Sequence, residues 1–434
     1  MTAKIVLATL GSHGDIHPFI ALGKALQNRG FEVVAATSGH YRPLFEREGL
    51  RFSAIGPDEG DALRVMGVSA DAFVKELLTD DLAVVRFSQD FLAESVRDLM
   101  PVVAGADLVV CHHIAYAAQL AAESFGIPYV HVLLSPTLLL QPEDPPVLGT
   151  APFVRAPGKL GQMWNRSLAS SLRLAFRPFT RRARRLRAAM GLPPARDLPF
   201  LDPGDALDVL GLFSPLLMTA PKNSLGLGAT FHDGGAAQKL APEVEAFLDG
   251  GSPPVVLTLG SFAALGGADI LRDGVAAARA LGRRALVIAG RDDARAIGAP
   301  EGDDLLIWGY APHSQVFARA AAILHHGGAG TSVQALRAGK PQLIAPFFAD
   351  QPDNAARVAR LGVARVLPRA KFSTQRAVAA LRHLLEKPDY ALRAGEMAAR
   401  IGAEDGAGAA AEVIARLVRQ KKTPPEAAAP SSRN

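Results

Sequence analysis

The sequence is poor in several features, and each shortage excludes a class of protein. Its one cysteine, Cys111, excludes an internal disulfide and fits a reducing compartment; at the end of an apolar run it is expected to be a small core residue. No run of about 18 uncharged apolar residues occurs, and the apolar run near the amino terminus is too short for a signal-peptide core. We therefore expect a cytoplasmic protein, or one peripheral at the inner membrane face.

The chain also has little net charge. Its 434 residues carry a formal net charge of only +5, so a basic surface can only be local. Arginines concentrate in Arg177–Arg187, RPFTRRARRLR. A solvated helix face explains this cluster, and the alternative is a weak peripheral contact with anionic lipid or with an acidic acceptor. No interleaved aromatics or recognised binding module accompany the arginines, so no nucleic-acid partner is expected.

Alternating apolar runs predict an α/β protein with more than one domain. A length of 434 residues favours two or three domains. Short buried strands alternate with helical sequence in both halves, which is typical of doubly wound parallel sheets. The turn Gly11–Asp15 follows the first strand, and the first helix is expected to begin at Pro18. Strands are predicted at 4–10, 31–36, 51–55, 107–111, 129–133, 208–213, 254–259, 284–288, 304–308, 321–324 and 342–345.

Shifts in composition suggest the domain boundaries. The segment 135–160 is proline-rich and irregular, and we expect it to form the wall of an acceptor pocket. A glycine-rich connection follows the last strand of the first half. We expect a first domain at 1–220, a linker at 221–250, a second domain at 251–395, a helix at 396–419 that packs back on the first domain, and a disordered tail at 420–434.

Residues 321–351, AAILHHGGAGTSVQALRAGKPQLIAPFFADQ, predict an anion-binding turn. A short apolar strand, three glycines and a return to helical spacing indicate strand, turn and helix. The first amides of the helix, from about Ala329, lack internal partners, and His326 is placed at the tip of the strand to donate a hydrogen bond to the same anion. A diphosphate would fit there. After the next apolar run, Asp350-Gln351 supplies oxygens and an amide suited to a ligand's hydroxyls.

The order of these parts is more specific than the glycine turn alone. Tyr310-Ala311-Pro312, His326–Thr331, Pro341, Pro346 and Asp350-Gln351 together resemble the C-terminal donor signature of a glycosyltransferase family. This is the UDP-glycosyltransferase-like family of nucleotide-sugar-dependent enzymes, and the motifs are most similar to those of its sterol glucosyltransferases and rhamnosyltransferases. The resemblance implies the GT-B fold, in which two doubly wound domains face each other across a cleft.

The resemblance also implies roles for individual residues in donor binding. The aromatic residue before Ala-Pro stacks on the base, the histidine and the following amides hold the diphosphate, and the Asp-Gln pair holds the sugar. Trp308 remains an alternative to Tyr310 for stacking, because it lies two residues earlier on the same face of an extended segment. The donor-binding residues so expected are Gly11, Ser12, Ser261, Trp308, Tyr310, Ala311, His326, Gly328, Ala329, Gly330, Thr331, Asp350 and Gln351.

The first turn, Gly11-Ser-His-Gly-Asp15 followed by Ile-His-Pro-Phe, resembles the N-terminal signature of the same family. The catalytic base of its sterol and rhamnosyl members falls on Asp15, and His13 is a further catalytic candidate with no assigned role. The alternative is that Asp15 only caps the following helix, together with Ser12. His112 and His113 follow another strand, and they are candidates to pair with Asp15 or to contact the acceptor.

The activity implied is inverting transfer of a hexose, glucose or rhamnose, from a UDP- or dTDP-sugar. The acceptor would be a hydroxyl of a small hydrophobic molecule: a polyphenol, a lipid or hydroxy fatty acid, a sterol or a macrolide-like compound. No Asp-x-Asp pair or metal-ligand cluster occurs in the sequence, so neither a metal nor a further cofactor is expected. The alternatives are a sugar-nucleotide epimerase and a non-catalytic nucleotide-sugar-binding protein of the same fold.

Overall fold

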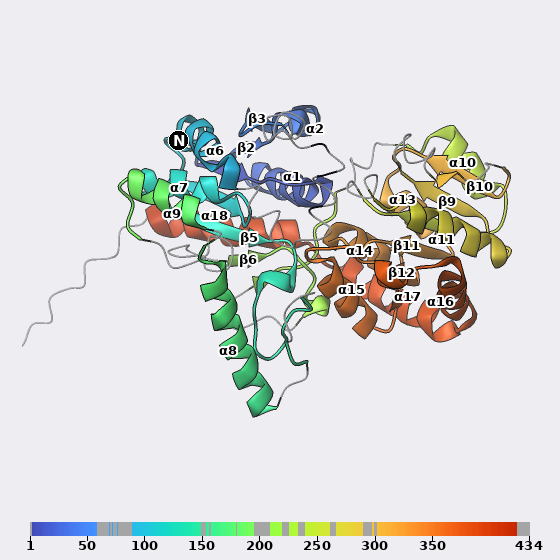
Figure 1. The fold of residues 1–434 in the computed structure, drawn as a ribbon. Helices are drawn as coiled ribbons and strands as arrows, with labels where there is room; N and C mark the ends of the chain where they lie inside the picture. Colours follow the sequence, from blue (N-terminus) through green and yellow to red (C-terminus); the bar gives the residue numbers. More distant parts are fainter. Residues whose placement is uncertain are drawn as a thin grey trace, which may run out of the picture.

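The computed structural model describes residues 2–58, 69, 72, 76, 89–148, 153–155, 158–178, 180–194, 209–218, 225–232, 239–260, 266–289, 297–298 and 302–422. The chain forms two lobes, each built on a sheet (Figure 1). The first sheet has seven strands in the order β3-β2-β1-β4-β5-β6-β7, and the second has six in the order β10-β9-β8-β11-β12-β13. The named strands pair in parallel throughout, which confirms the two predicted doubly wound sheets.

The central strands are continuous apolar runs because helices cover both faces of each sheet. In both sheets the strand order reverses beside a central strand, and the carboxyl ends of the strands at such a point are where ligands bind. The strands are β1 (Lys4–Ala8), β2 (Glu32–Thr37), β3 (Arg51–Ala54), β4 (Leu108–His112), β5 (Tyr129–Leu133), β6 (Val209–Gly211), β7 (Leu225–Gly226), β8 (Val255–Thr258), β9 (Ala285–Ile288), β10 (Leu305–Trp308), β11 (Ala322–His325), β12 (Gln342–Ile344) and β13 (Ala364–Val366).

Helices connect these strands in both lobes. Those of the first lobe are α1 (His13–Gln27), α2 (Arg42–Arg47), α6 (Leu92–Val103), α7 (Tyr116–Ser124), α8 (Lys159–Phe176) and α9 (Arg181–Ala189), with 3₁₀ turns η1 (Gly39–Tyr41), η2 (Pro136–Leu138) and η3 (Pro215–Leu217). Later in the chain follow α10 (Pro242–Asp249), α11 (Ala268–Ala280), α13 (His313–Ala318), α14 (Ala329–Arg337), α15 (Gln351–Arg360), η5 (Arg369–Lys371), α16 (Thr374–Glu386), α17 (Pro388–Gly402) and α18 (Gly406–Lys422).

The first helix begins at His13, so the prediction that it begins at Pro18 was wrong. Ser12 is the N-cap and Asp15 completes a capping box, which satisfies the first amides five residues earlier than expected. Pro18 therefore lies inside α1. A capping box is a stronger start signal than a proline, because it supplies hydrogen bonds to groups that otherwise have none.

Two short edge strands were not predicted from the sequence. The first, β7, is only two residues long, and β13 has one buried residue followed by two exposed ones. An edge strand has neighbours on one side only, so it needs no continuous apolar run. The cysteine is a core residue, as predicted: Cys111 lies in β4 and is fully buried in a hydrophobic cluster.

The expected linker and crossing helix both differ from the structure. The helix α10 lies within 221–250 and packs Val244 and Leu248 into a core cluster of the second lobe. Residues 396–402 are the last turns of α17, and the helix that crosses to α1 is α18, which begins at Gly406. A side chain at Gly406 would come within 2.1 Å of the Gly228 carbonyl oxygen, so the crossing needs a glycine there. Of the predicted tail, 420–422 are helical and 423–434 lie outside the described residues.

The helix α8 stands away from the body of the first lobe (Figure 1). Leu160, Met163 and Leu174 are exposed on it. On α9, Arg181, Arg182 and Arg185 are exposed, as a solvated face requires, whereas Arg187 is buried and pairs with Glu123. No helix in the described part of the chain is long and apolar enough to cross a membrane.

Candidate active site

The turn after β1 presents one carboxylate, Asp15, with its two oxygens in different roles. The Oδ2 atom accepts hydrogen bonds from the Ser12 amide at 2.8 Å and from the Ser12 hydroxyl at 3.2 Å. These bonds hold the carboxylate against the amino end of α1. Gly11 has φ +121°, and a Cβ built on it would lie 2.3 Å from the same Oδ2 atom. A glycine is therefore required at position 11 both by the backbone and by the space that the carboxylate occupies.

The other oxygen of Asp15 faces His112, the last residue of β4. The distance from Asp15 Oδ1 to His112 Nε2 is 3.8 Å, and the His112 ring is fully buried. His112 Nδ1 lies 3.2 Å from the Leu10 carbonyl oxygen, which can only accept, so Nδ1 carries the proton. The lone pair of Nε2 then faces Asp15, and Nε2 has no hydrogen-bond partner among the described residues. Burial keeps the pKa of His112 well below its usual range, so the ring is neutral.

Burial also raises the pKa of the Asp15 carboxyl, to about 7. The side chain keeps 30% of its surface accessible, so it is reachable although protein surrounds it closely. The negative charge of Asp350, which belongs to the second lobe, contributes to the same upward shift of the Asp15 pKa. The pKa of Asp350 is itself raised to about 6, again mainly by burial. The structure thus brings together two carboxyls from the two lobes, which sequence motifs had singled out independently.

The other two histidines predicted in this lobe have different surroundings. The His13 ring makes edge contacts with Tyr41 and with His17, both at 5.4 Å between ring centroids. These contacts group His13 with the aromatic rings beside α1. The His113 ring lies 4.2 Å from that of His112, and burial lowers its pKa to about 3. His112 is therefore the histidine that the structure places against Asp15.

In the second lobe, β11 leads through Gly327 and Gly328 into α14, which begins at Ala329 as predicted. Gly328 is the N-cap, and no side chain accepts from the first amides of this helix. Those amides, at the positive end of the helix dipole, are the parts of a phosphate-binding site. The predicted residues Ala329, Gly330 and Thr331 form this first turn, and all keep part of their surface accessible.

The ring of His326 lies between two glycines at this turn. A Cβ on Gly260 would come within 2.7 Å of the ring, and one on Gly328 within 2.4 Å of its Nε2 atom. His326 Nδ1 is buried and has no partner within the described part of the chain. Burial lowers the pKa of His326 to about 3, so the ring is neutral and can donate one hydrogen bond. Ser261, predicted to assist here, lies outside the described residues.

His325, which the sequence analysis did not single out, shapes the same turn. It is fully buried, its Nδ1 accepts from the Gly327 amide at 3.1 Å, and its Nε2 donates to the Gln342 side chain at 2.9 Å. The two bonds fix both the ring and its tautomer. Of the adjacent pair, the sequence motif selected His326 for the ligand, and alternation along the strand turns His325 into the core.

The two aromatic candidates for base stacking differ in exposure. Trp308 is the last residue of β10 and packs partly against the core beneath the sheet. Tyr310 is 47% exposed, and Ala311 beside it is buried. A ring that stacks on a ligand must present an open face, which favours Tyr310. Trp308 supports the segment from behind.

The Asp350-Gln351 pair follows β12, at the start of α15. Gln351 Oε1 accepts from the amides of Phe347 at 2.9 Å and Phe348 at 3.4 Å, and so holds the preceding loop. Ala349 has φ +55° and is the one non-glycine residue of the described chain with positive φ. Backbone strain of this kind gathers at functional sites, where it fixes a side chain in one orientation. Here it lies directly before Asp350, whose carboxylate accepts a hydrogen bond from Asn354.

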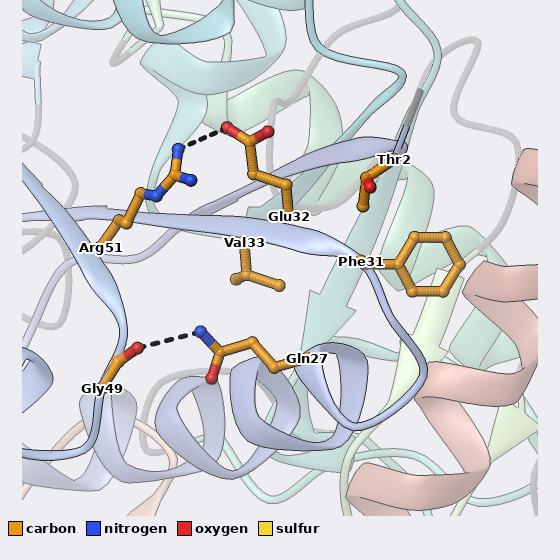
Figure 2. A pocket seen from close by; sticks show the side chains of 7 residues that line it. All are labelled: Thr2, Gln27, Phe31, Glu32, Val33, Gly49 and Arg51. Carbon is orange, nitrogen blue, oxygen red and sulfur yellow. Dashed lines mark hydrogen bonds and ion pairs between the residues drawn. The ribbon is translucent and has the colours of Figure 1, made fainter.

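A surface hollow elsewhere on the first lobe is unrelated to this site (Figure 2). Its rim carries the ion pair between Glu32 and Arg51, and Glu32 opens β2. It therefore lies at the amino ends of the strands, whereas Asp15 and His112 follow their carboxyl ends. Ligands of doubly wound sheets bind at the carboxyl ends. The hollow is lined by Thr2, Gln27, Phe31, Glu32, Val33, Gly49 and Arg51.

Known proteins are similar to this chain in both sequence and fold. Residues 5–137 match the glycosyltransferase family 28 N-terminal domain, and residues 288–419 match the C-terminal domain of erythromycin biosynthesis protein CIII-like proteins. The chain is 33% identical to glycosyltransferase GtfE of Amycolatopsis orientalis, with 96% of this chain and 98% of that protein covered. It is 32% identical to O-mycaminosyltylonolide 6-deoxyallosyltransferase of Streptomyces fradiae, with 97% and 99% covered.

Other relatives and solved structures agree with these matches. Vancomycin aglycone glucosyltransferase of Amycolatopsis orientalis is 31% identical, with 96% of this chain and 98% of that protein covered. Spinosyn forosaminyltransferase SpnP has a TM-score of 0.69 at 18% identity, with 96% of this chain and 100% of that chain covered. VinC, solved in complex with dTDP, has a TM-score of 0.68 at 20% identity and the same coverage. These two structures share the two-lobed fold.

Proposed function

Because the chain belongs to the UDP-glycosyltransferase-like family of GT-B glycosyltransferases, we propose that it is an inverting hexosyltransferase with Asp15 as its base. The first lobe, with residues 1–220, binds the acceptor, and the second lobe binds the nucleotide sugar. One observation supports this most directly: the carboxyl of Asp15 and that of Asp350 approach each other from different lobes. That is where an acceptor hydroxyl and the sugar of a donor would have to meet.

The proposed reaction begins with proton transfer. Asp15 Oδ1 takes the proton of the acceptor hydroxyl as that oxygen attacks the anomeric carbon, and the nucleoside diphosphate leaves from the opposite face. The configuration at that carbon is inverted. A pKa of about 7 makes Asp15 a stronger base than an ordinary carboxylate. His112, whose Nε2 lone pair faces Asp15, can share the acquired proton through a small shift of the carboxyl.

The negative charge that develops on the leaving diphosphate is proposed to be met by protein groups alone. The neutral His326 ring donates one hydrogen bond, and the open amides at the start of α14 supply more. Tyr310 stacks on the base, and Asp350-Gln351 binds the sugar hydroxyls. We therefore propose that no metal ion and no cofactor take part, the nucleotide sugar being a substrate.

The acceptor is proposed to be a hydrophobic molecule with a hydroxyl group. The relatives named above act on a vancomycin aglycone and on O-mycaminosyltylonolide, as their names state, which favours a polyphenol or macrolide-like acceptor over a lipid or sterol. The exposed apolar side chains of α8 offer such a molecule a surface. A membrane contact through Arg177–Arg187 is the weaker proposal, since Arg187 and Arg182 already pair with Glu123 and Asp90.

One experiment tests the proposal against its alternatives. UDP-glucose, dTDP-glucose and dTDP-rhamnose are incubated with the protein and with a pooled set of polyphenol and macrolide aglycones. Products are found by mass spectrometry, and their configuration is determined by proton NMR. A new glycoside with the opposite anomeric configuration to the donor is expected. Conversion of the donor sugar without any acceptor would instead identify an epimerase. Donor binding with no reaction across the set would identify a binding protein.

A further inference from the structure

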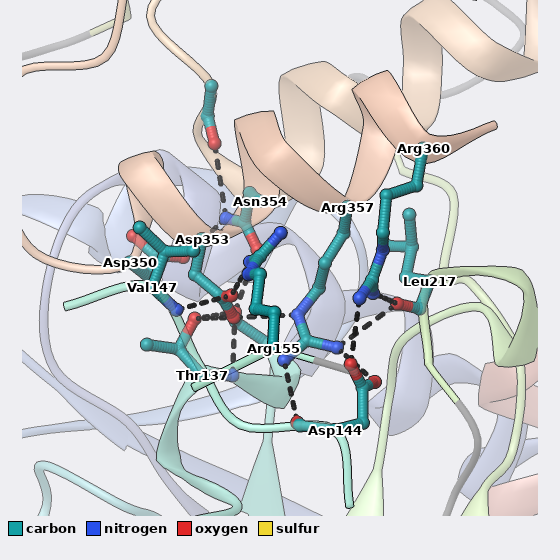
Figure 3. A network of polar contacts seen from close by, with 12 residues as sticks. Thr137, Asp144, Val147, Arg155, Leu217, Asp350, Asp353, Asn354, Arg357 and Arg360 are labelled. Atoms are coloured by element: carbon teal, nitrogen blue, oxygen red, sulfur yellow. Dashed lines mark hydrogen bonds and ion pairs between the residues drawn. The ribbon is translucent and has the colours of Figure 1, made fainter. Parts of the chain in front are cut away.

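A buried polar network joins the two lobes at α15 (Figure 3). On the side of the second lobe it contains Asp353, Asn354 and Arg357, each 1% exposed or less. On the side of the first lobe it contains the segment that follows β5, which begins with Ser135 and the turn η2. Polar groups so deeply buried are stable only when each has a partner, so the network fixes how the lobes meet.

Asn354 connects three parts of the proposed site through one amide. Its Nδ2 donates to Asp350 Oδ2 at 2.8 Å and to the Gly327 carbonyl oxygen at 3.1 Å, and its Oδ1 accepts from the Ser135 hydroxyl at 2.9 Å. The first bond reaches the carboxylate proposed to hold the sugar, and the second reaches the turn proposed to hold the diphosphate. The third bond comes from the other lobe. Both amide hydrogens are used, so the orientation of the amide is fixed.

The hydroxyl of Ser135 has a choice of acceptors. Besides Asn354 Oδ1, it lies 2.9 Å from the Thr137 hydroxyl, and its proximity lowers the pKa of Asp350 against the larger effect of burial. The Thr137 hydroxyl donates its own proton to Asp353, so the single proton of Ser135 can go to Thr137 or to Asn354. Ser135 therefore contacts the supporting amide of Asp350 from the first lobe.

Two charged residues of α15 keep the lobes in this arrangement. Asp353 accepts from the Thr137 hydroxyl at 3.0 Å and from the Val147 amide at 2.9 Å, both in the first lobe. Arg357 donates to Asp353 at 2.7 Å and to Asp144 of the first lobe at 2.6 Å. If the lobes separated, each of these buried groups would lose partners, which is unfavourable unless water replaces them. The bond from Ser135 to Asn354 thus exists only while the lobes are closed.

We propose that Asn354 and Ser135 are positioning residues that make the orientation of Asp350 depend on closure of the two lobes. The proposal rests on the proposed function, in which Asp350 binds the sugar of the donor. In the closed form Asn354 holds one carboxylate oxygen, and Ser135 holds Asn354. In an open form Ser135 is withdrawn and Asn354 Oδ1 loses that partner, while its Nδ2 keeps the two bonds within the second lobe. The closed form therefore adds one hydrogen bond to the amide that holds Asp350, and the sugar should be held most firmly when the acceptor-binding lobe is in place.

The test compares the binding of a nucleotide sugar with that of the same nucleoside diphosphate. Four ligands are titrated by calorimetry: UDP-glucose, UDP, dTDP-glucose and dTDP. The proteins are the wild type, Asp350→Asn, Asn354→Ala, Ser135→Ala and the Ser135→Ala/Asn354→Ala double variant. The sugar's contribution to affinity is measured as the dissociation constant of the nucleoside diphosphate divided by that of the nucleotide sugar. Asn354→Ala is expected to reduce that ratio by about tenfold and Ser135→Ala by about threefold, while the affinity for the nucleoside diphosphate changes less.

The double variant shows whether the two residues act through one link. If Ser135 acts through Asn354, the double variant should lose no more than Asn354→Ala alone, because the shared interaction can be lost only once. Full additivity of the two losses would overturn the link. Ser135→Ala removes only one oxygen from a folded turn, so it provides a reading even if Asn354→Ala fails to fold.

Asn165 offers a matched control. It too is a buried asparagine with three hydrogen bonds, to the Val154 amide and carbonyl and to the Pro142 carbonyl, all within the first lobe. Asn165→Ala should lower stability as Asn354→Ala does but leave the affinity ratio unchanged. An equal drop in the ratio for both variants would overturn the positioning role and indicate a general structural effect.

Asp350→Asn separates failure of this inference from failure of the proposed function. If Asp350→Asn lowers the ratio and Asn354→Ala does not, the coupling is wrong and the sugar site stands. If Asp350→Asn leaves the ratio unchanged, Asp350 does not hold the sugar, and both the assignment and the inference that rests on it are overturned.

Discussion

The turns after β1 and β11 have the same outline, a strand followed by glycine and a helix, but the two helix ends differ chemically. At α1 the first amides are satisfied by the chain's own side chains, Ser12 and Asp15. At α14 the N-cap is Gly328, and no side chain accepts from the first amides. A helix end that carries its own carboxylate can present a base, whereas one left open can bind an anion. The same supersecondary unit thus serves two halves of one proposed reaction.

Both turns use glycine to make room for a functional side chain. Gly11 leaves space for the carboxylate of Asp15, and Gly260 and Gly328 leave space for the ring of His326. The glycines therefore set the position of the reactive group as well as the path of the backbone. If the two turns divide the reaction in this way, changes at the first should affect proton transfer, and changes at the second should affect the leaving group.

The largest effect is expected at Asp15. Asp15→Asn keeps an oxygen that can cap Ser12, so the variant should fold with no loss of stability, but it cannot accept a proton and should lose about 10² to 10⁴ in kcat. The loss should be smaller for acidic phenols than for aliphatic alcohols, whose protons need more help to leave. Steady-state kinetics with both acceptor types measures this. Transfer to an aliphatic alcohol at the wild-type rate would mean that Asp15 only caps α1, and His112 or His13 would become the first candidate.

The next effect is expected at the open helix end. His326→Ala removes one hydrogen bond to the leaving diphosphate, so kcat/KM should fall by about 10²-fold for every acceptor alike, since the leaving group is the same. Thermal unfolding should confirm that the variant folds. Turnover near that of the wild type would contradict the diphosphate assignment.

The pH dependence should distinguish the two turns as well. The pKa of Asp15 is about 7, so kcat/KM should fall about tenfold per unit below pH 7 and level off above. Protonation of Asp350, whose pKa is about 6, should steepen the fall below pH 6. His326, with a pKa of about 3, should contribute nothing in that range. A flat profile between pH 5.5 and 7.5 would contradict a buried carboxylate base.

Stability should follow the opposite trend with pH. A carboxyl whose pKa is raised on folding binds more protons in the folded state, so the stability it contributes is present at low pH and is lost as the pH rises from 3.8 through about 7. Asp15→Asn should therefore unfold at a higher denaturant concentration than the wild type at pH 8, and the gap should close at pH 4. Equal midpoints at pH 8 would indicate a solvated carboxyl.

A smaller effect is expected from the glycines of the first turn. Gly11→Ala puts a methyl group 2.3 Å from Asp15 Oδ2 and forces φ +121° on alanine, so it should destabilise the protein by about 1–2 kcal/mol and reduce kcat about tenfold. Gly14→Ala is the matched control: its nearest contact would be the Ser12 hydroxyl at 3.6 Å, and alanine favours a helix. Similar kcat values for the two variants would show that Gly11 does not position the base.

No effect is expected from metal removal. If the amides of α14 and His326 meet the charge of the leaving group, activity should survive excess chelator. Loss of activity that magnesium or manganese restores would show that the open helix end is not sufficient.

The sequence by itself determined the parts of the site that depend on local pattern. Continuous apolar runs predicted the central strands, and glycines between strand and helix predicted both turns, because these features need only a few neighbouring residues. The start of α1 was misplaced at Pro18 although Ser12 and Asp15 were at hand, since a capping residue and a catalytic residue look the same in a sequence. The short edge strands gave no pattern to find.

Only the tertiary structure decided what depends on distant neighbours. The pKa of Asp15 reflects burial and the charge of Asp350, 335 positions away in the numbering of the chain. The tautomer of His112 is set by the Leu10 carbonyl, and the amide of Asn354 is held from the other lobe by Ser135. Such contacts arise from the packing of two lobes, and desolvation and hydrogen-bond partners are properties of that packing rather than of residue type.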